Sequence, residues 1–172
     1  MNLQSTDFEL FDLPPRFAQD AAQIDARWKA LQRQTHPDRF AAQGAAAQRV
    51  ALQWSARINE AYRRLKDPLA RAAYLCELHG APIRAEDNTA MPPEFLARQL
   101  AWREALDEAD TPAVFQALRA EVDAARLSTL SSLEWLLDEQ GDAQTAAAQV
   151  RALMFIQRFA DDLERQCELR KI

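Results

Sequence analysis

The segment from Gln32 to Phe40 constrains the fold more than any other part of the chain, because a helix that enters it cannot continue through it. Pro37 has no backbone N–H to donate, and it disfavours the helical conformation at the residue before it. A second amphipathic run follows, from about Ala45 to Leu65. We therefore expect two helices joined by an exposed polar corner at His36, Pro37 and Asp38.

Composition favours helices in the rest of the chain as well. Of the 172 residues, 48% are hydrophobic and only 3 are glycine. Ala, Leu, Gln, Glu and Arg, which favour helices, are abundant. The sequence predicts an all-α protein with one domain at residues 1–80 and another at 94–172. A proline-containing polar stretch at 81–93 is predicted to connect them.

The first domain is predicted to be a helical hairpin with short flanking helices. Asp20 is a candidate cap for a helix at about 21–35. The hairpin's second helix is expected at about 45–66, and a short helix is expected on either side, at about 8–13 and 69–79. The predicted core residues of the hairpin follow helical spacing: Ile24, Trp28, Leu31 and Thr35 on one helix, and Val50, Trp54, Ile58, Ala61 and Leu65 on the other.

The second domain is predicted to be a three-helix bundle. Its helices are expected at about 94–109, 112–140 and 142–170. Thr111 and Pro112 suit the start of the middle helix, and Gly141 suits its end. Short connections make the last two helices antiparallel neighbours.

Basic side chains near the corner have two interpretations. Lys29 and Arg33 fall roughly opposite the core stripe of their helix, at about 100° per residue. Arg27 and Arg39 are close by in the sequence. A charged helix face is most often only solvated surface. The alternative is a docking surface for an acidic protein.

A second candidate surface lies in the bundle. On its first helix, six residues fall outside the predicted core stripe: Leu96, Ala97, Leu100, Ala101, Glu104 and Glu108. On its last helix, most apolar side chains point in the same direction as Leu153. Phe155 points about 160° away from that direction. Scattered apolar residues are normal on protein surfaces. The alternative is one partner-binding patch made by both helices.

These features resemble a known family. The His36-Pro37-Asp38 corner between two helices, preceded by basic residues, resembles the J-domain of DnaJ-type co-chaperones. The runs Leu75–Gly80 and Phe95–Leu100, continued by Arg103–Glu108, are similar to HscB, the co-chaperone family of bacterial iron–sulfur cluster assembly. Thr35 stands where many J-domains have a tyrosine.

The resemblance implies two partners. An HscA-type chaperone would be bound, and its ATPase stimulated, by the corner and its basic neighbours, namely His36, Pro37, Asp38, Lys29, Arg33, Arg27 and Arg39. An IscU-type iron–sulfur scaffold protein would be bound by the second surface, namely Leu96, Ala97, Leu100, Ala101, Glu104, Glu108 and Phe155. A general J-domain adaptor for other client proteins is the alternative.

The residues disfavour other classes of function. His36 and Asp38 could form an acid–base pair, but no nucleophile is placed beside them, and the chain has no glycine-rich phosphate loop. We expect no enzyme activity and no cofactor. Cys76 and His79 are three residues apart, but two ligands do not make a zinc site, so no metal is expected. The two cysteines are predicted to be buried apolar residues.

Charge and hydropathy indicate the kind of partner and the compartment. The first 80 residues contain 11 basic and 9 acidic residues, and the remainder contains 10 basic and 17 acidic ones. An acidic second half favours a basic protein partner over nucleic acid. The amino terminus has no signal-peptide pattern, and no apolar run approaches the roughly 20 residues of a membrane span. We expect a cytoplasmic protein that has no membrane partner.

Overall fold

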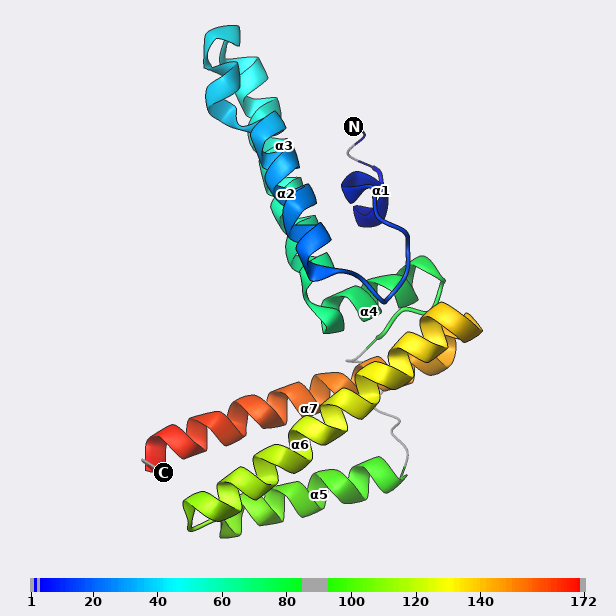
Figure 1. The fold of residues 1–172 in the computed structure, drawn as a ribbon, viewed down its shortest axis with the longest axis vertical. Helices are drawn as coiled ribbons and strands as arrows, with labels where there is room; N and C mark the ends of the chain where they lie inside the picture. Colours follow the sequence, from blue (N-terminus) through cyan, green and yellow to red (C-terminus); the bar gives the residue numbers. More distant parts are fainter. Residues whose placement is uncertain (1, 3, 85–92, 171–172) are drawn as a thin grey trace. The chain divides into compact units, whose positions relative to one another are not determined.

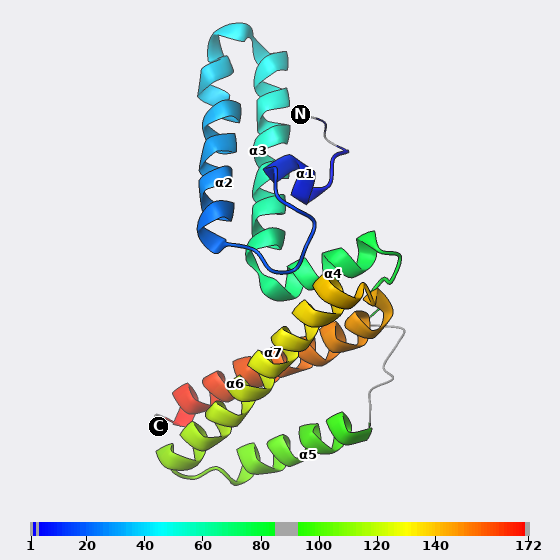
Figure 2. The same ribbon diagram turned by 45° about the vertical axis from the view of Figure 1, so that its right-hand side comes forward.

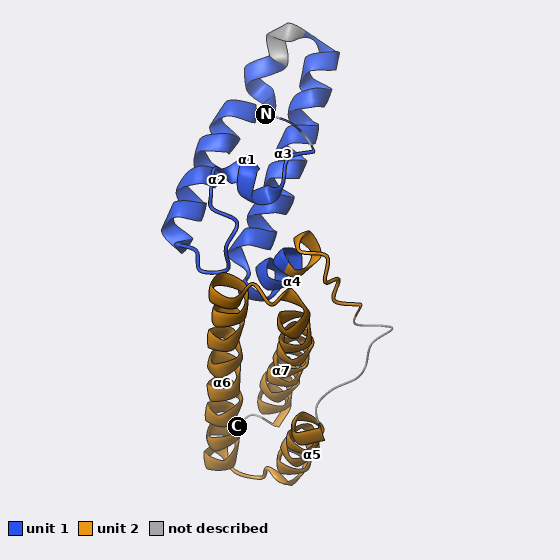
Figure 3. Cartoon of the chain, turned by 90° about the vertical axis from the view of Figure 1, so that its right-hand side faces the viewer, with its two compact units in different colours: residues 1–75 blue, residues 76–172 orange. Residues whose placement is uncertain are grey.

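The fold is described here from a computed structural model, in which residues 2, 4–84 and 93–170 are described, with the side chains of 41–43 excepted. The described residues form helices and turns and include no strand. The chain divides into two compact units, residues 1–75 and 76–172 (Figure 3). The division lies close to the predicted boundary at residue 80. The predicted connection at 81–93 is described only in part, because residues 85–92 lie outside the described residues.

The first unit is the predicted helical hairpin with its short flanking helices. Its elements are α1 (Asp7–Phe11), α2 (Ala21–Thr35), the 3₁₀ segment η1 (Pro37–Gln43), α3 (Ala45–Lys66) and α4 (Pro68–Leu78), which crosses the division. Helices α2 and α3 run antiparallel, side by side, in Figures 1 and 2. Asp20 caps α2 as predicted, since its side chain accepts a hydrogen bond from the backbone N–H of Ala22.

A row of polar contacts fixes the register of α2 against α3. Near the start of α2, the Asp25 carboxylate accepts hydrogen bonds from Lys66 at 2.6 Å and from Tyr62 at 2.9 Å. Further along, Asn59 accepts from the Trp28 ring nitrogen at 3.0 Å and from the Gln32 amide at 2.6 Å. At the end of α2, the Ser55 hydroxyl donates to the Thr35 carbonyl at 3.4 Å. We call these contacts the hairpin seam.

The prediction that Val50 is buried was wrong. Val50 is 51% exposed, and its neighbour Ala51 is buried instead. The last residue of α2, Thr35, faces Ser55 of α3, so Val50 lies beyond the end of α2. Beside this part of α3 lies the short η1 segment, and Phe40 of η1 lines a hollow together with Val50.

A buried charge joins α1 to α3. Asp7 is fully buried, and its two carboxylate oxygens contact Arg57 at 2.7 Å and Arg64 at 3.2 Å. Its backbone N–H donates to the Tyr74 hydroxyl at 3.0 Å. The Arg64 guanidinium also lies 4.7 Å from the centre of the Tyr74 ring. The carboxylate is therefore both desolvated and paired, and loss of one partner leaves charge without compensation.

The second unit contains α5 (Pro93–Glu108), α6 (Pro112–Glu134), the π-helical turn η2 (Trp135–Gln140) and α7 (Ala143–Arg170). Helices α6 and α7 are antiparallel, as predicted, and α5 packs beside α6. The Trp102 ring nitrogen of α5 donates to Glu121 of α6 at 2.8 Å. The bundle core joins all three helices through Trp102, Leu106, Phe115, Leu118, Val122, Ile156, Phe159 and Leu163.

Two details of the second unit differ from the sequence prediction. The helix expected to span 112–140 changes to π-helical geometry at Trp135, and both Leu136 and Leu137 are buried there. In the predicted connection, Ala81 and Ile83 are buried in the second unit. The guanidinium of Arg151 donates to the Ile83 carbonyl at 3.1 Å, which fixes this segment against α7.

We expect Asp7→Asn to destabilise the first unit by about 3 kcal/mol, because Arg57 loses its buried counter-charge and Arg64 keeps only its pair with Glu60 at 2.7 Å. The measurement is urea denaturation followed by circular dichroism. Asp12→Asn is the matched control: Asp12 pairs with Arg27 at 2.6 Å, but its side chain is 83% exposed. This control should lose no more than about 1 kcal/mol. Equal stability of Asp7→Asn and wild type would show that the buried pairing contributes nothing net.

Candidate functional site

The His36 corner is a tight turn between α2 and η1. The chain leaves the helical conformation at His36, where ψ is 127°, as expected for a residue before proline. The His36 Nδ1 accepts a hydrogen bond from the backbone N–H of Asp38 at 3.3 Å. The backbone N–H of Arg39 donates to the His36 carbonyl at 3.0 Å. The turn is thus closed by its own hydrogen bonds.

The corner presents its polar side chains to solvent. The His36 side chain is 55% exposed and that of Asp38 is 90% exposed, and Nδ1 of His36 lies 3.5 Å from Oδ2 of Asp38. The imidazole and the carboxylate of the corner are therefore both accessible to a partner. Among the described residues, no serine or cysteine is hydrogen-bonded to His36. The corner is thus an exposed polar turn between two helical segments.

Three of the predicted basic residues lie close to the corner. Lys29 and Arg33 are exposed on α2. The Arg33 Nε donates to the Lys29 carbonyl at 3.3 Å, which lays the Arg33 side chain along the helix. Arg39 follows the corner, and its Nη1 donates to the Arg33 carbonyl at 2.9 Å. The structure therefore brings Lys29, Arg33 and Arg39 together beside His36 and Asp38.

Arg27 is placed differently from the other basic residues. Its guanidinium pairs with Asp12, which follows α1, at 2.6 Å. Asp12 has a positive φ of 52°, a conformation that aspartate tolerates better than most residues. Any partner of Arg27 must compete with Asp12 for the guanidinium.

Thr35 contributes to the interior of the corner and not to its surface. It is buried, and its hydroxyl donates to the Leu31 carbonyl at 3.0 Å. With Phe40 and Trp54 among its neighbours, it lines a hollow of about 450 Å³. Its difference from the tyrosine of many J-domains therefore affects packing beneath the corner.

On α5, six of the seven predicted second-surface residues lie together on the exposed side of the helix. Leu96 is 49% exposed and Leu100 is 60% exposed. The other four, Ala97, Ala101, Glu104 and Glu108, are also exposed. Neither Glu104 nor Glu108 forms an ion pair within the described part of the chain. This face combines two large apolar side chains with two uncompensated negative charges.

Phe155 is not the exposed residue that the sequence predicted. It is half-buried and packs edge-on against Phe95 of α5, with ring centres 5.7 Å apart. It also stacks on Phe159, one turn further along α7, at 6.4 Å. Phe95 of α5 packs on this side of α7, so a side chain that points away from Leu153 also meets apolar neighbours.

A hollow of about 390 Å³ lies between Phe155 of α7 and residues of α5. Phe155 lines it with six other residues of α5 and α7: Arg103, Leu106, Asp107, Arg158, Phe159 and Asp162. The spacing of Leu96, Leu100, Arg103 and Asp107 puts them on one line of α5. The exposed leucines thus lead to the edge of this hollow. Arg103 and Arg158 are not among the residues predicted for this surface, although the spacing that relates Leu96 to Leu100 also identifies Arg103.

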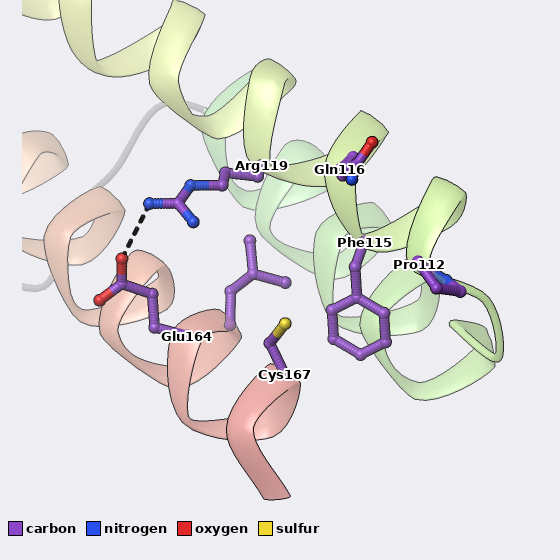
Figure 4. Close-up of a pocket in the computed structure, with 7 residues that line it drawn as sticks. Pro112, Phe115, Gln116, Arg119, Glu164 and Cys167 are labelled. Carbon is purple, nitrogen blue, oxygen red and sulfur yellow. Dashed lines mark hydrogen bonds and ion pairs between the residues drawn. The ribbon is translucent and has the colours of Figure 1, made fainter. Parts of the chain in front are cut away.

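A separate hollow lies between α6 and α7. Figure 4 shows the Phe115 ring and the Cys167 sulfur beside it, with the Arg119–Glu164 ion pair at its edge. This pair measures 3.0 Å. The hollow has a volume of about 180 Å³. It is too small for a protein segment, and none of the predicted site residues lines it.

The two cysteines differ in burial. Cys76 is buried, and burial raises the pKa of its thiol to about 11, whereas Cys167 is partly buried. The described residues contain no group of three or more potential ligands from His, Cys, Asp and Glu. Within the same residues, no helix is both long and apolar enough to span a membrane.

Comparisons with known proteins agree with these observations. Residues 91–164 match the family model of the HSCB C-terminal oligomerisation domain. The co-chaperone protein HscB homolog of Bordetella pertussis is 52% identical over 157 residues, which cover 91% of this chain and 92% of the relative.

Solved structures extend the similarity to the fold of the whole chain. The chaperone HscB from Vibrio cholerae is 35% identical, with a TM-score of 0.83 and coverage of 96% of this chain and 99% of that one. The human co-chaperone protein HscB is 26% identical, with a TM-score of 0.91 and coverage of 100% and 85%. The all-α architecture of a J-domain followed by a helical bundle is therefore confirmed, and the chain belongs to the HscB family of co-chaperones.

Proposed function

We propose that this co-chaperone stimulates the ATPase of an HscA-type chaperone and delivers an IscU-type iron–sulfur scaffold protein to it. Residues 1–80 act as the J-domain in this proposal, and residues 94–172 bind the scaffold. The chain itself catalyses no reaction, and it acts in the cytoplasm. The observation that carries the proposal is the exposed His36-Pro37-Asp38 corner with Lys29, Arg33 and Arg39 beside it.

The geometry of the corner supports the chaperone half of the proposal. A proline-fixed turn holds the exposed His36 imidazole next to one exposed carboxylate, that of Asp38. The neighbouring cations attract an acidic surface and speed encounter with it. A co-chaperone that binds one conformation of its partner more tightly than another shifts the population toward that conformation. Stimulation of ATP hydrolysis then needs no catalytic group on this chain.

The α5 face supports the scaffold half of the proposal. Leu96 and Leu100 are exposed and lie one helical turn apart on the same face of α5. This is expected of apolar anchors that become buried in a complex. Glu104 and Glu108 lie on the same helix and form no ion pair within the described residues. Such a surface fits a partner with an apolar patch beside basic residues, and the net negative charge of the second half agrees with this.

The alternative is a general J-domain adaptor that binds unfolded client proteins. Retention of an IscU-type scaffold protein in a pull-down with the full chain supports the first proposal. Retention of unfolded polypeptides alone supports the alternative.

We expect His36→Gln to abolish stimulation of an HscA-type ATPase. The glutamine cannot reproduce the imidazole's bond to the Asp38 N–H together with the exposed ring. Because the residue is exposed, the free energy of unfolding should change by less than about 0.5 kcal/mol. The measurement is steady-state phosphate release by the chaperone, with thermal denaturation of the variant as the control. Full stimulation by a folded variant would remove the J-domain from the mechanism.

We expect Leu96→Ala and Leu100→Ala each to weaken scaffold binding by about 2 kcal/mol, roughly thirtyfold in Kd, mainly through faster release. Glu104→Lys and Glu108→Lys should mainly slow association at low salt. Surface plasmon resonance with an IscU-type scaffold protein separates the two rates. Phe155→Ala is a weaker test, since the half-buried ring also packs against Phe95 and Phe159.

Leu127→Ala is the matched control for the leucine variants. Leu127 lies on α6 and is 64% exposed, about as much as Leu100. The control should bind the scaffold like wild type. Unchanged binding by both α5 leucine variants would exclude this face as the scaffold site, while the J-domain assignment would still depend on the His36→Gln result.

A further inference from the structure

Arg39 is held at both ends across the His36 corner. Its backbone N–H donates to the His36 carbonyl at 3.0 Å. Its guanidinium Nη1 reaches back over the turn and donates to the Arg33 carbonyl at 2.9 Å. One residue therefore ties the η1 segment, on which Asp38 lies, to the last turn of α2.

The Arg39 side chain supplies the hydrogen-bond donor that the Arg33 carbonyl would otherwise lack. The last four carbonyls of a helix have no intrahelical donor, and Pro37 prevents α2 from continuing to supply one. A carbonyl near the negative end of the helix dipole is also a good acceptor for a cation. The guanidinium satisfies both conditions at Arg33, and Ser55 supplies the donor for the Thr35 carbonyl.

The same contact restricts the orientation of the corner. The turn is closed by two other hydrogen bonds, from Asp38 N–H to Nδ1 of His36 at 3.3 Å and from Arg39 N–H to the His36 carbonyl. Both of these lie within the turn. Of the side-chain hydrogen bonds that residues 36–39 form in the described structure, the Arg39 bond is the one that reaches into α2, and η1 also packs against α3.

We propose that Arg39 is a positioning residue, which orients His36 and Asp38 relative to Lys29 and Arg33 by capping the carboxyl end of α2. This inference rests on the proposed stimulation of a chaperone ATPase. It assigns the orienting role to Arg39's planar guanidinium, whereas a partner contact would depend mainly on its charge. The two roles separate in a lysine substitution, because lysine keeps the charge but offers a compact ammonium in place of the fork.

The test compares Arg39→Lys and Arg39→Gln with wild type in a titration of the HscA-type ATPase. The maximum stimulation reports orientation, and the half-maximal co-chaperone concentration reports binding. For Arg39→Lys we expect the maximum to fall at least roughly fivefold, the lower end of typical coupling between sites, with the half-maximal concentration within about twofold of wild type. Arg39→Gln should lose the maximum to the same extent.

Nuclear magnetic resonance provides a readout that is independent of the ATPase. The backbone amide signals of Asp38 and Arg33 should shift in Arg39→Lys while those of the hairpin seam stay in place. Arg49→Lys, at an exposed arginine of α3, is the matched control and should match wild type in both measurements.

The outcomes separate this inference from the function on which it rests. A wild-type maximum with Arg39→Lys, together with weaker binding of Arg39→Gln, would identify a charge contact and overturn the positioning role. Wild-type stimulation by His36→Gln would instead overturn the proposed function. Loss of the seam amide signals in Arg39→Lys would also contradict the inference, because the effect would then be general unfolding.

Discussion

The hairpin seam between α2 and α3 is the interaction on which the candidate chaperone-binding site depends. Asp25, Asn59 and Ser55 each connect the two helices, and they do so at the start, the middle and the end of α2. These contacts set which residue of α2 faces which residue of α3. Register in turn fixes where α2 ends relative to its neighbour, and hence where the corner projects.

The Asp25–Lys66 ion pair makes the stability of the hairpin seam depend on pH. The hydrogen bond from Lys66 lowers the pKa of Asp25, and the same contact raises the pKa of Lys66. The contribution of Asp25 to stability is present above its unfolded-state pKa and is lost as the pH falls through its folded-state value. The contribution of Lys66 is lost only as the pH rises through its own raised pKa. Between these limits the pair stays charged and the register is maintained.

The features of the fold that depend on one helix alone could be predicted from the sequence. The bounds of α2 and its cap at Asp20 follow from local signals, and so does the exposure of Leu96 and Leu100 on α5. The errors occur where a neighbouring helix decides. Val50 has the spacing of a core residue, but α2 ends before it can cover that position. Phe155 points away from Leu153, but Phe95 of α5 packs against it on that side of α7 and leaves it half-buried.

The candidate sites follow the same distinction. The corner could be located because Pro37 forces the chain out of the helix, whatever surrounds it. The hydrogen bond from Arg39 to Arg33 could not be foreseen, since it depends on the path of η1 after the turn. Likewise, the Arg27–Asp12 pair depends on how α1 packs against the hairpin. Periodicity gives the face of a side chain, but only the packed structure gives its partner.

Each proposed binding surface consists of residues of one unit only. The covalent link would then be what brings scaffold and chaperone together, by raising the effective concentration of one near the other. Mixing the full-length His36→Gln and Leu100→Ala variants tests this claim most directly. Each variant retains one functional surface, so the chaperone ATPase rate with scaffold protein present should stay as low as with Leu100→Ala alone. A mixture that restores the scaffold-dependent rate of the wild-type chain would contradict the account.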